Sequence, residues 1–154
     1  MKKVILLILC GIFIVSLNLE FEVTTAAKSS ESTVKQYEGM PSKLNNKYWM
    51  VKDNDHKEFY YGTKRKLYGK HTKIGSFYSK WLSYMKVNGV YIITGTYSDS
   101  TNDVIWWFVK PNKSWTKIRI GFTKVPFKSI PDHSPSYYMK SVATRVTKVT
   151  AMLY

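Results

Sequence analysis

The stretch Leu82–Tyr97, LSYMKVNGVYIITGTY, constrains the fold of this chain more than any other. Two runs rich in β-branched and aromatic residues flank Asn88-Gly89, and both turn residues tolerate the positive φ angles of a type I′ turn. This pattern predicts a tight antiparallel hairpin. Between residues 40 and 133 the sequence has no 3.6-residue apolar stripe with helix caps. The chain is therefore predicted to be all-β.

Further strands are expected on either side of this hairpin. They are predicted at 47–52, 58–69 (one bent strand or two), 73–79, 103–110 and 113–122, with a short helical turn at 135–140 and a closing strand near 142–150. The proline-rich stretch 126–136 is expected to be a loop or an edge. About six to eight short antiparallel strands indicate a small barrel or a sandwich. We favour the barrel, because closure removes exposed strand edges.

The N-terminus has the three-part layout of a secretory signal peptide. Met1-Lys2-Lys3 precedes an apolar run, Val4–Leu17, and small residues follow up to Ala27. The apolar run is shorter than the roughly 20 residues of a spanning helix. We therefore expect a signal peptide at 1–27, a flexible polar linker at 28–40, a barrel domain at 41–154 without a transmembrane span, and a secreted, extracellular protein associated with the cell wall.

The charge of the chain points to its partners. The formal net charge is +14, and it stays at +14 without residues 1–27, which hold two lysines and two glutamates. A protein with this charge is attracted to polyanions, which outside a bacterium are wall polymers and anionic lipids. Cys10 is the single cysteine and lies in the predicted leader, so the secreted domain is held together by its core alone.

The segment Pro41–Trp49, PSKLNNKYW, resembles the opening of small secreted lipocalin-like proteins of Gram-positive bacteria. Pro41 and Leu44 match the entry of that family, and Tyr48-Trp49 match its aromatic pair. Asn46 stands where the family has glycine, and asparagine is the next-best residue for a left-handed backbone conformation. The resemblance implies an extracellular antiparallel barrel and no defined ligand.

No local motif of catalysis or metal binding occurs. His56, His71 and His133 are too far apart for a zinc signature, and Asp53-Asn54-Asp55 lacks the spacing of a calcium loop. The chain also has no G-x-S-x-G nucleophile elbow. We therefore predict a noncatalytic protein without a metal or a cofactor.

The hairpin VIWWFVKPNKSW, Val104–Trp115, contains three of the five tryptophans. With Pro111-Asn112 as its turn, Phe108 faces Trp115 and Trp106 faces Lys117. Because side chains alternate along a strand, one face is predicted to be core: Ile105, Trp107, Val109, Ile118 and Ile120. The other face is aromatic with cationic ends: Val104, Trp106, Phe108, Trp115, Lys117 and Arg119. That face is either covered by a terminal segment, with Lys117 and Arg119 lying over Trp106, or open to a ligand.

A second basic stretch, residues 62–73, contains Lys64, Arg65 and Lys66. Such lysines either protect an edge strand from pairing or form an anion-binding patch.

The leading hypothesis is a secreted, basic, noncatalytic binding protein that associates with anionic cell-envelope polymers or surfaces and has no specific nucleic-acid partner. Its predicted ligand-binding residues are Trp106, Phe108, Trp115, Lys117, Arg119, Lys64, Arg65 and Lys66. The alternatives are a lipocalin-like carrier of a small apolar ligand, which needs an interior not filled by side chains, and a secreted cationic antimicrobial protein.

Overall fold

The computed structural model describes residues 34–52, 57–71, 75–100, 102–148 and 150. The chain divides into two units, 1–34 and 35–154. The predicted signal peptide and the start of the predicted linker, up to residue 33, lie outside the described residues. Within the described ranges, no helix is long and apolar enough to cross a bilayer.

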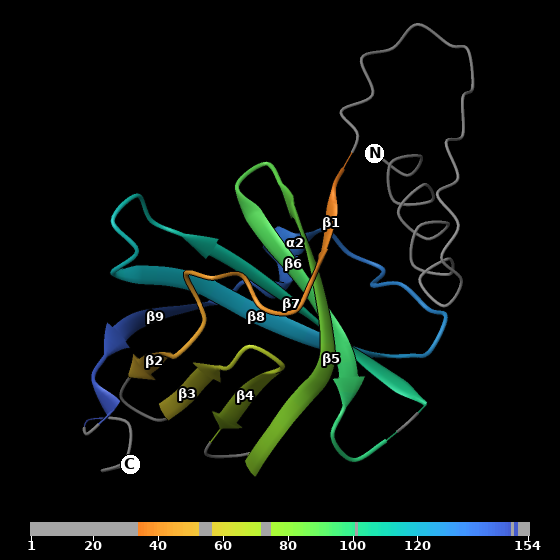
Figure 1. Cartoon of the computed structure of the whole chain (residues 1–154), viewed down its shortest axis with the longest axis horizontal. Coiled ribbons are helices and arrows are strands. Elements are labelled where there is room, and N and C mark those ends of the chain that lie inside the picture. Colours follow the sequence, from red (N-terminus) through yellow and green to blue (C-terminus); the bar gives the residue numbers. More distant parts are fainter. Residues whose placement is uncertain (1–33, 53–56, 72–74, 101, 149, 151–154) are drawn as a thin grey trace, which may run out of the picture. The chain divides into compact units, whose positions relative to one another are not determined.

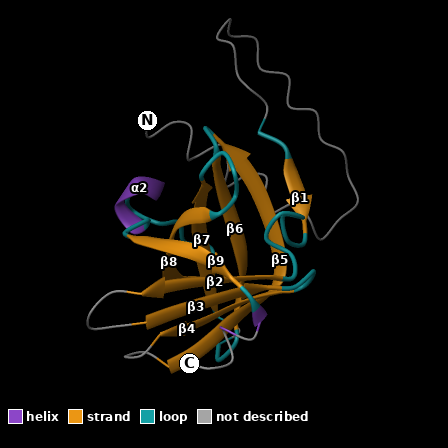
Figure 2. Ribbon diagram, turned by 90° about the vertical axis from the view of Figure 1, so that its left-hand side faces the viewer, coloured by secondary structure: helices purple, strands orange, loops and turns teal. Residues whose placement is uncertain are grey.

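The second unit is an all-β, closed antiparallel barrel (Figures 1 and 2). Its elements are β1 (Gln36–Glu38), β2 (Lys47–Lys52), β3 (Lys57–Gly62), β4 (Lys66–His71), β5 (Gly75–Val87), β6 (Val90–Tyr97), β7 (Asp103–Pro111), β8 (Lys117–Pro126), α2 (Pro135–Tyr138) and β9 (Ser141–Val146). From β2 to β9 each strand pairs with the next, and β9 pairs with β2. The barrel thus has eight strands, and β1 adds to the edge of β5.

Several predicted elements are confirmed. The β5–β6 hairpin turns at Asn88 and Gly89, which have φ angles of 49° and 77°. The expected helical turn and closing strand are α2 and β9. Asn46 has a φ of 53°, as the glycine-like position in the opening predicts.

One boundary differs from the expectation, and one alternative that the sequence left open is decided. Strand β1 lies inside the predicted linker, and Met40, which was also assigned to the linker, is buried in the core. The stretch 58–69 is two strands, joined by a tight turn at Lys64-Arg65. The folded unit therefore begins at Lys35 rather than at Pro41.

The register of the tryptophan hairpin was predicted wrongly. Phe108 pairs with Gly121 and Trp106 with Thr123, whereas the prediction paired them with Trp115 and Lys117. The cause is Asn112, whose side-chain oxygen accepts hydrogen bonds from the backbone N–H groups of Thr116 and Lys117 at 3.0 and 3.1 Å. This produces a longer turn, and β8 begins only at Lys117. Since the facing partner shifts by six residues, an even number, the assignment of the β7 and β8 side chains to the two faces is unchanged. Trp115, which was predicted on the outer face, instead lies in the turn and packs against the core cluster.

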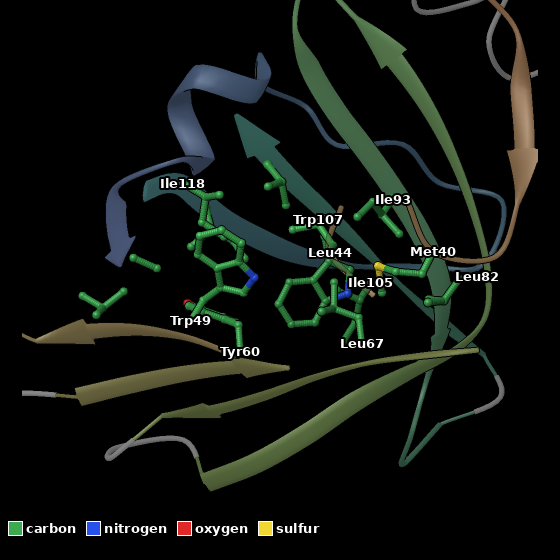
Figure 3. Close-up of a cluster of buried hydrophobic side chains, with 14 of the residues drawn as sticks. Met40, Leu44, Trp49, Tyr60, Leu67, Leu82, Ile93, Ile105, Trp107 and Ile118 are labelled. Atoms are coloured by element: carbon green, nitrogen blue, oxygen red, sulfur yellow. The ribbon is translucent and has the colours of Figure 1, made fainter. Parts of the chain in front are cut away.

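Trp107 lies at the centre of the barrel interior and is fully buried. Its indole Nε1 donates a hydrogen bond to Ser79 Oγ at 2.7 Å, and its ring packs against Phe77, Tyr60 and Phe122 at centroid distances of 5.6, 5.9 and 5.1 Å. Figure 3 shows side chains from opposite strands meeting in this core. The predicted core face of the hairpin is confirmed, because all five of its members belong to this cluster. The interior is thus occupied by the protein's own side chains.

Candidate polyanion-binding surface

The outer face of the tryptophan hairpin is covered. The exposed fractions of Trp106 and Phe108 are 7% and 3%. The ring of Tyr138, in α2, stacks on Phe108 with centroids 5.1 Å apart, and Figure 2 shows α2 outside the barrel beside β8. The backbone of this segment lies directly on Gly121, where a Cβ atom would come within 1.8 Å of the Tyr138 carbonyl oxygen. Trp106 and Phe108 therefore present no free surface to a ligand.

The other predicted residues of this hairpin lie apart from the two covered rings. Trp115 is in the turn and is half-buried, with its ring 5.6 Å from that of Tyr91. Lys117 and Arg119 are exposed on β8, where they pair with Thr144 and Val142 of β9. Because Trp106 pairs with Thr123, its cross-strand neighbour is not Lys117.

The second predicted basic group lies at the tip of the β3–β4 hairpin. Thr63 closes this turn: its backbone N–H donates to the Lys66 carbonyl at 2.8 Å, and its hydroxyl accepts from the Lys66 N–H at 3.0 Å. Lys64 and Arg65 are exposed at the tip, and Lys66 begins β4. Within the described part of the chain, neither Lys64 nor Arg65 has an ion-pair partner.

Beside this turn, four tyrosines on four adjacent strands lie in direct register on the outer face of the barrel. Tyr48 pairs with Tyr61, Tyr61 with Tyr68, and Tyr68 with Tyr78. The intervening residues, including Trp49 and Tyr60, point into the core, so all four tyrosines point outward. With a strand spacing of about 4.8 Å, this tyrosine row spans roughly 14 Å across β2–β5.

Three rings of the tyrosine row stack on one another, and the fourth, Tyr78, is tilted by 42° to Tyr68 with centroids 5.4 Å apart. The ring centroids of Tyr48 and Tyr61 are 4.3 Å apart at an interplanar angle of 11°, and those of Tyr61 and Tyr68 are 6.0 Å apart at 23°. Rings stacked along the row turn their edges outward, and ring edges carry the positive end of the aromatic quadrupole. The row therefore offers ring edges and hydroxyl groups to solvent rather than flat faces.

Cationic groups lie close to the row. The Lys66 ammonium lies 4.7 Å from the ring centroid of Tyr78 and 6.0 Å from that of Tyr68. Lys66 pairs with Lys80 across β4 and β5. Partial burial, together with a hydrogen bond to Tyr48, raises the pKa of Tyr61. The Tyr61 hydroxyl donates a hydrogen bond to Asn46 Oδ1 at 3.4 Å.

A groove of about 410 Å³ runs beside the tyrosine row on the same face. Tyr61, Tyr68 and Tyr78 line one side of it. The next row of paired outward residues, Phe59, Lys70 and Ser76, lines the other side, and Ser98 and Asp99 after β6 also line the groove. The groove thus crosses the strands from β2 to β5.

One polar network lies on the inward side of the same strands. Glu58 is buried; it accepts a hydrogen bond from the Tyr60 hydroxyl and lies 3.3 Å from His71 Nε2. Burial and the contact with Glu58 raise the pKa of Tyr60 well above its ordinary value. The network satisfies a buried carboxylate, and no group of metal-ligating side chains occurs among the residues described.

The tyrosine row was missed because its register depends on a turn without the usual signals. Lys64-Arg65 contains no glycine, asparagine or proline, and Thr63 supplies the hydrogen bonds that define the turn. Had residues 63–66 been identified as a turn, Tyr61 and Tyr68 would have been predicted to face each other.

Comparison with known proteins does not assign this surface. No family model, no curated protein and no solved structure matches the chain. The surface is therefore interpreted from its own chemistry, and membership of the lipocalin-like family stays a prediction.

Proposed function

We propose that this protein is a secreted, noncatalytic binding protein that associates with anionic polymers of the cell envelope through the outer face of β2–β5. The observation that carries the proposal is the tyrosine row, which presents hydroxyl donors and positive ring edges beside Lys66 and the Lys64-Arg65 tip. Phosphate and carboxylate groups are the natural acceptors for such donors. The net charge of +14 adds long-range attraction.

The shape of the face favours a polymer over a small ligand. The groove crosses strands next to a row roughly 14 Å long, so several anionic units of one chain can be contacted at once. The carrier hypothesis has less support, because Trp107 and its aromatic neighbours occupy the barrel interior.

The proposal is tested by cosedimentation with Gram-positive cell walls, before and after their phosphate polymers are removed. We expect binding to intact walls that weakens steeply between about 0.1 and 0.5 M salt, and little binding to stripped walls. The triple variant K64E/R65E/K66E should lower the affinity at least about tenfold. Salt-insensitive binding, or equal binding to both wall preparations, would contradict the proposal.

A matched control separates position from net charge. The variant K110E/K113E/R119E changes the charge by the same amount on the β7–β8 hairpin. We expect it to retain most of the binding. Equal loss in both triple variants would mean that overall charge, not the β2–β5 face, holds the polymer.

The tyrosine hydroxyls are tested separately. The variant Y61F/Y68F/Y78F keeps the rings and removes three hydroxyl groups, one of which, on Tyr61, donates to Asn46. We therefore expect a loss of stability of at most about 1 kcal/mol and an affinity several-fold lower. Y91F is the control, because Tyr91 packs against the barrel core and lies outside the row. Wild-type affinity in the triple variant would limit the row to a structural role.

A further inference from the structure

Trp81 is the most exposed large apolar side chain among those described. Its exposed fraction is 74%, and it lies in the irregular part of β5, where the pairing with β6 shifts between Lys80 and Ser83. Its φ is 52°, in the left-handed region that a bulky side chain rarely adopts. The structure thus holds an indole in solvent on a strained backbone.

Trp115 has a similarly strained backbone, but its side chain is packed. Its φ is 56°, but its ring packs against the barrel core and lies 5.6 Å from the ring of Tyr91. For Trp115, burial offsets the backbone strain. Trp81 has no comparable burial, and glycine would adopt the same φ without strain. A strained residue whose side chain does little for the fold suggests a role in an interaction.

One cation lies against Trp81, and further cations lie on the neighbouring strand and turn. The Lys80 ammonium lies 4.7 Å from the indole centroid, and Lys80 pairs with Lys66. The β3–β4 turn lies against the same corner: Gly39 donates a backbone hydrogen bond to Leu82, and a Cβ atom on Gly39 would lie 3.1 Å from the Lys64 carbonyl oxygen. The acidic residue on the adjacent β1 is Glu38, which pairs with Ser83.

We propose that Trp81 is an anchor that inserts into the interfacial region of an anionic lipid bilayer, with Lys80, Lys66, Lys64 and Arg65 at the headgroups. An exposed indole has an apolar body and one polar N–H, the combination that places tryptophan at membrane interfaces. The flanking cations complement anionic headgroups. This site goes beyond the polymer-binding role, since its anchor lies outside the tyrosine row.

A bilayer fits this corner better than a sugar ring does. Trp81 does not line the groove, which lies on the far side of the tyrosine row along β5, beside Ser76 rather than Lys80. An indole that projects from the surface can enter a soft interface, whereas sugar binding needs surrounding hydrogen-bond partners. One anchor with a few cations gives weak, reversible binding that depends on anionic lipid.

The test uses the protein in the form that the producing cell secretes. It is mixed with vesicles of about 30 mol% phosphatidylglycerol in phosphatidylcholine. Some of the phosphatidylcholine carries brominated acyl chains that quench tryptophan. Trp49, Trp106 and Trp107 are buried and Trp115 is half-buried, so we expect most of the quenching to come from Trp81. We expect W81F to lose most of the quenching and W115F to keep it. Undiminished quenching in W81F would overturn the proposal.

A second pair of variants separates binding from folding. W81G should bind the vesicles at least about fivefold more weakly with a melting temperature no lower than that of the wild type, because the backbone strain is relieved. W115G is the matched control and should melt lower, since it loses a packed ring. If W81G melts as low as W115G, the indole is structural and the proposal fails.

The vesicle and cell-wall experiments can contradict the lipid proposal and the polymer proposal separately. Vesicle binding that is lost in W81G but kept in Y61F/Y68F/Y78F supports a lipid anchor, whatever the result with cell walls. If W81G instead loses wall binding and keeps vesicle binding, Trp81 belongs to the polymer site and the lipid proposal is overturned.

Discussion

Two outward faces of one barrel carry aromatic side chains, and they differ in what covers them. On β7, Trp106 and Phe108 are both buried, and Tyr138 of α2 stacks on Phe108. On β2–β5, the tyrosine row keeps its edges and hydroxyls in solvent contact. The covered rings are Trp and Phe, whereas the open rings are all tyrosines, whose polar end favours contact with water. The number of aromatic side chains on a face thus does not indicate whether that face is exposed. The presence of a phenol hydroxyl on those side chains is the better indicator.

Removing one ring from each face tests most directly whether the two faces differ in their contribution to stability. Phe108→Ala should lower the free energy of unfolding by about 3–5 kcal/mol, because it empties a packed site. Tyr68→Ala should cost less than about 1 kcal/mol, the scale of one cross-strand pair. Denaturant unfolding of both variants measures the difference. Similar losses would mean that the tyrosine row is as much a part of the fold as the covered face.

The cover itself can be displaced. Gly121→Ala puts a methyl group where the Tyr138 backbone lies, so it should cost about 1–3 kcal/mol and lift α2 from β8. Acrylamide quenching should then reach Trp106. Thr123→Ala, on the same strand and face, is the control and should leave α2 in place. A Gly121→Ala protein with wild-type quenching would show that the segment can shift without exposing the rings.

Tyr60 points into the barrel and Tyr61 points outward, so their titration should affect stability differently. The pKa of Tyr60 in the folded chain is well above its ordinary value of 10.0, so the unfolded chain loses this proton first as the pH rises. Stability should therefore be complete below about pH 10 and fall above it, by up to about 1.4 kcal/mol per pH unit for this group. Y60F should flatten the decline, and Y61F should change it less. The check is urea unfolding between about pH 9 and 11.5.

The smallest effect concerns the anchoring of α2. The Tyr138 hydroxyl donates a hydrogen bond to Asp132 at 2.5 Å, which lowers the pKa of Asp132 below its ordinary value of 3.8. This contribution is present above about pH 4 and is lost as the pH falls through the lowered pKa. Acrylamide quenching of Trp106 should rise slightly in that range, and D132N should remove the response. An identical response in D132N would assign it to other carboxylates.

The sequence predicted the barrel because its strongest signals are local. Asn88-Gly89 fixes its hairpin by backbone conformation alone, and the alternation in β7 and β8 assigned the two faces correctly even with a wrong register. Asn46 has the left-handed conformation expected of a residue in a glycine position.

The parts that failed depend on side chains acting on distant backbone. Asn112 lengthens its turn by binding two N–H groups several residues away, and Thr63 closes a turn that contains only cationic residues at its tip. The cover on Trp106 and Phe108 depends on where α2 docks, which no local pattern encodes. Of the predicted site residues, Lys66 lies beside the tyrosine row, but the row itself was not predicted.

The closure of the ring by β9 and β2 has a consequence for how the chain reaches its folded state. Most pairings join consecutive strands and can form as soon as a hairpin exists, but Tyr48 pairs with Val146, near the opposite end of the chain. Such a long-range contact requires loop closure over nearly the whole domain and slows folding. Until β9 arrives, β2 and β8 each leave one edge unpaired, so the partly emerged chain passes through an interval in which it can aggregate.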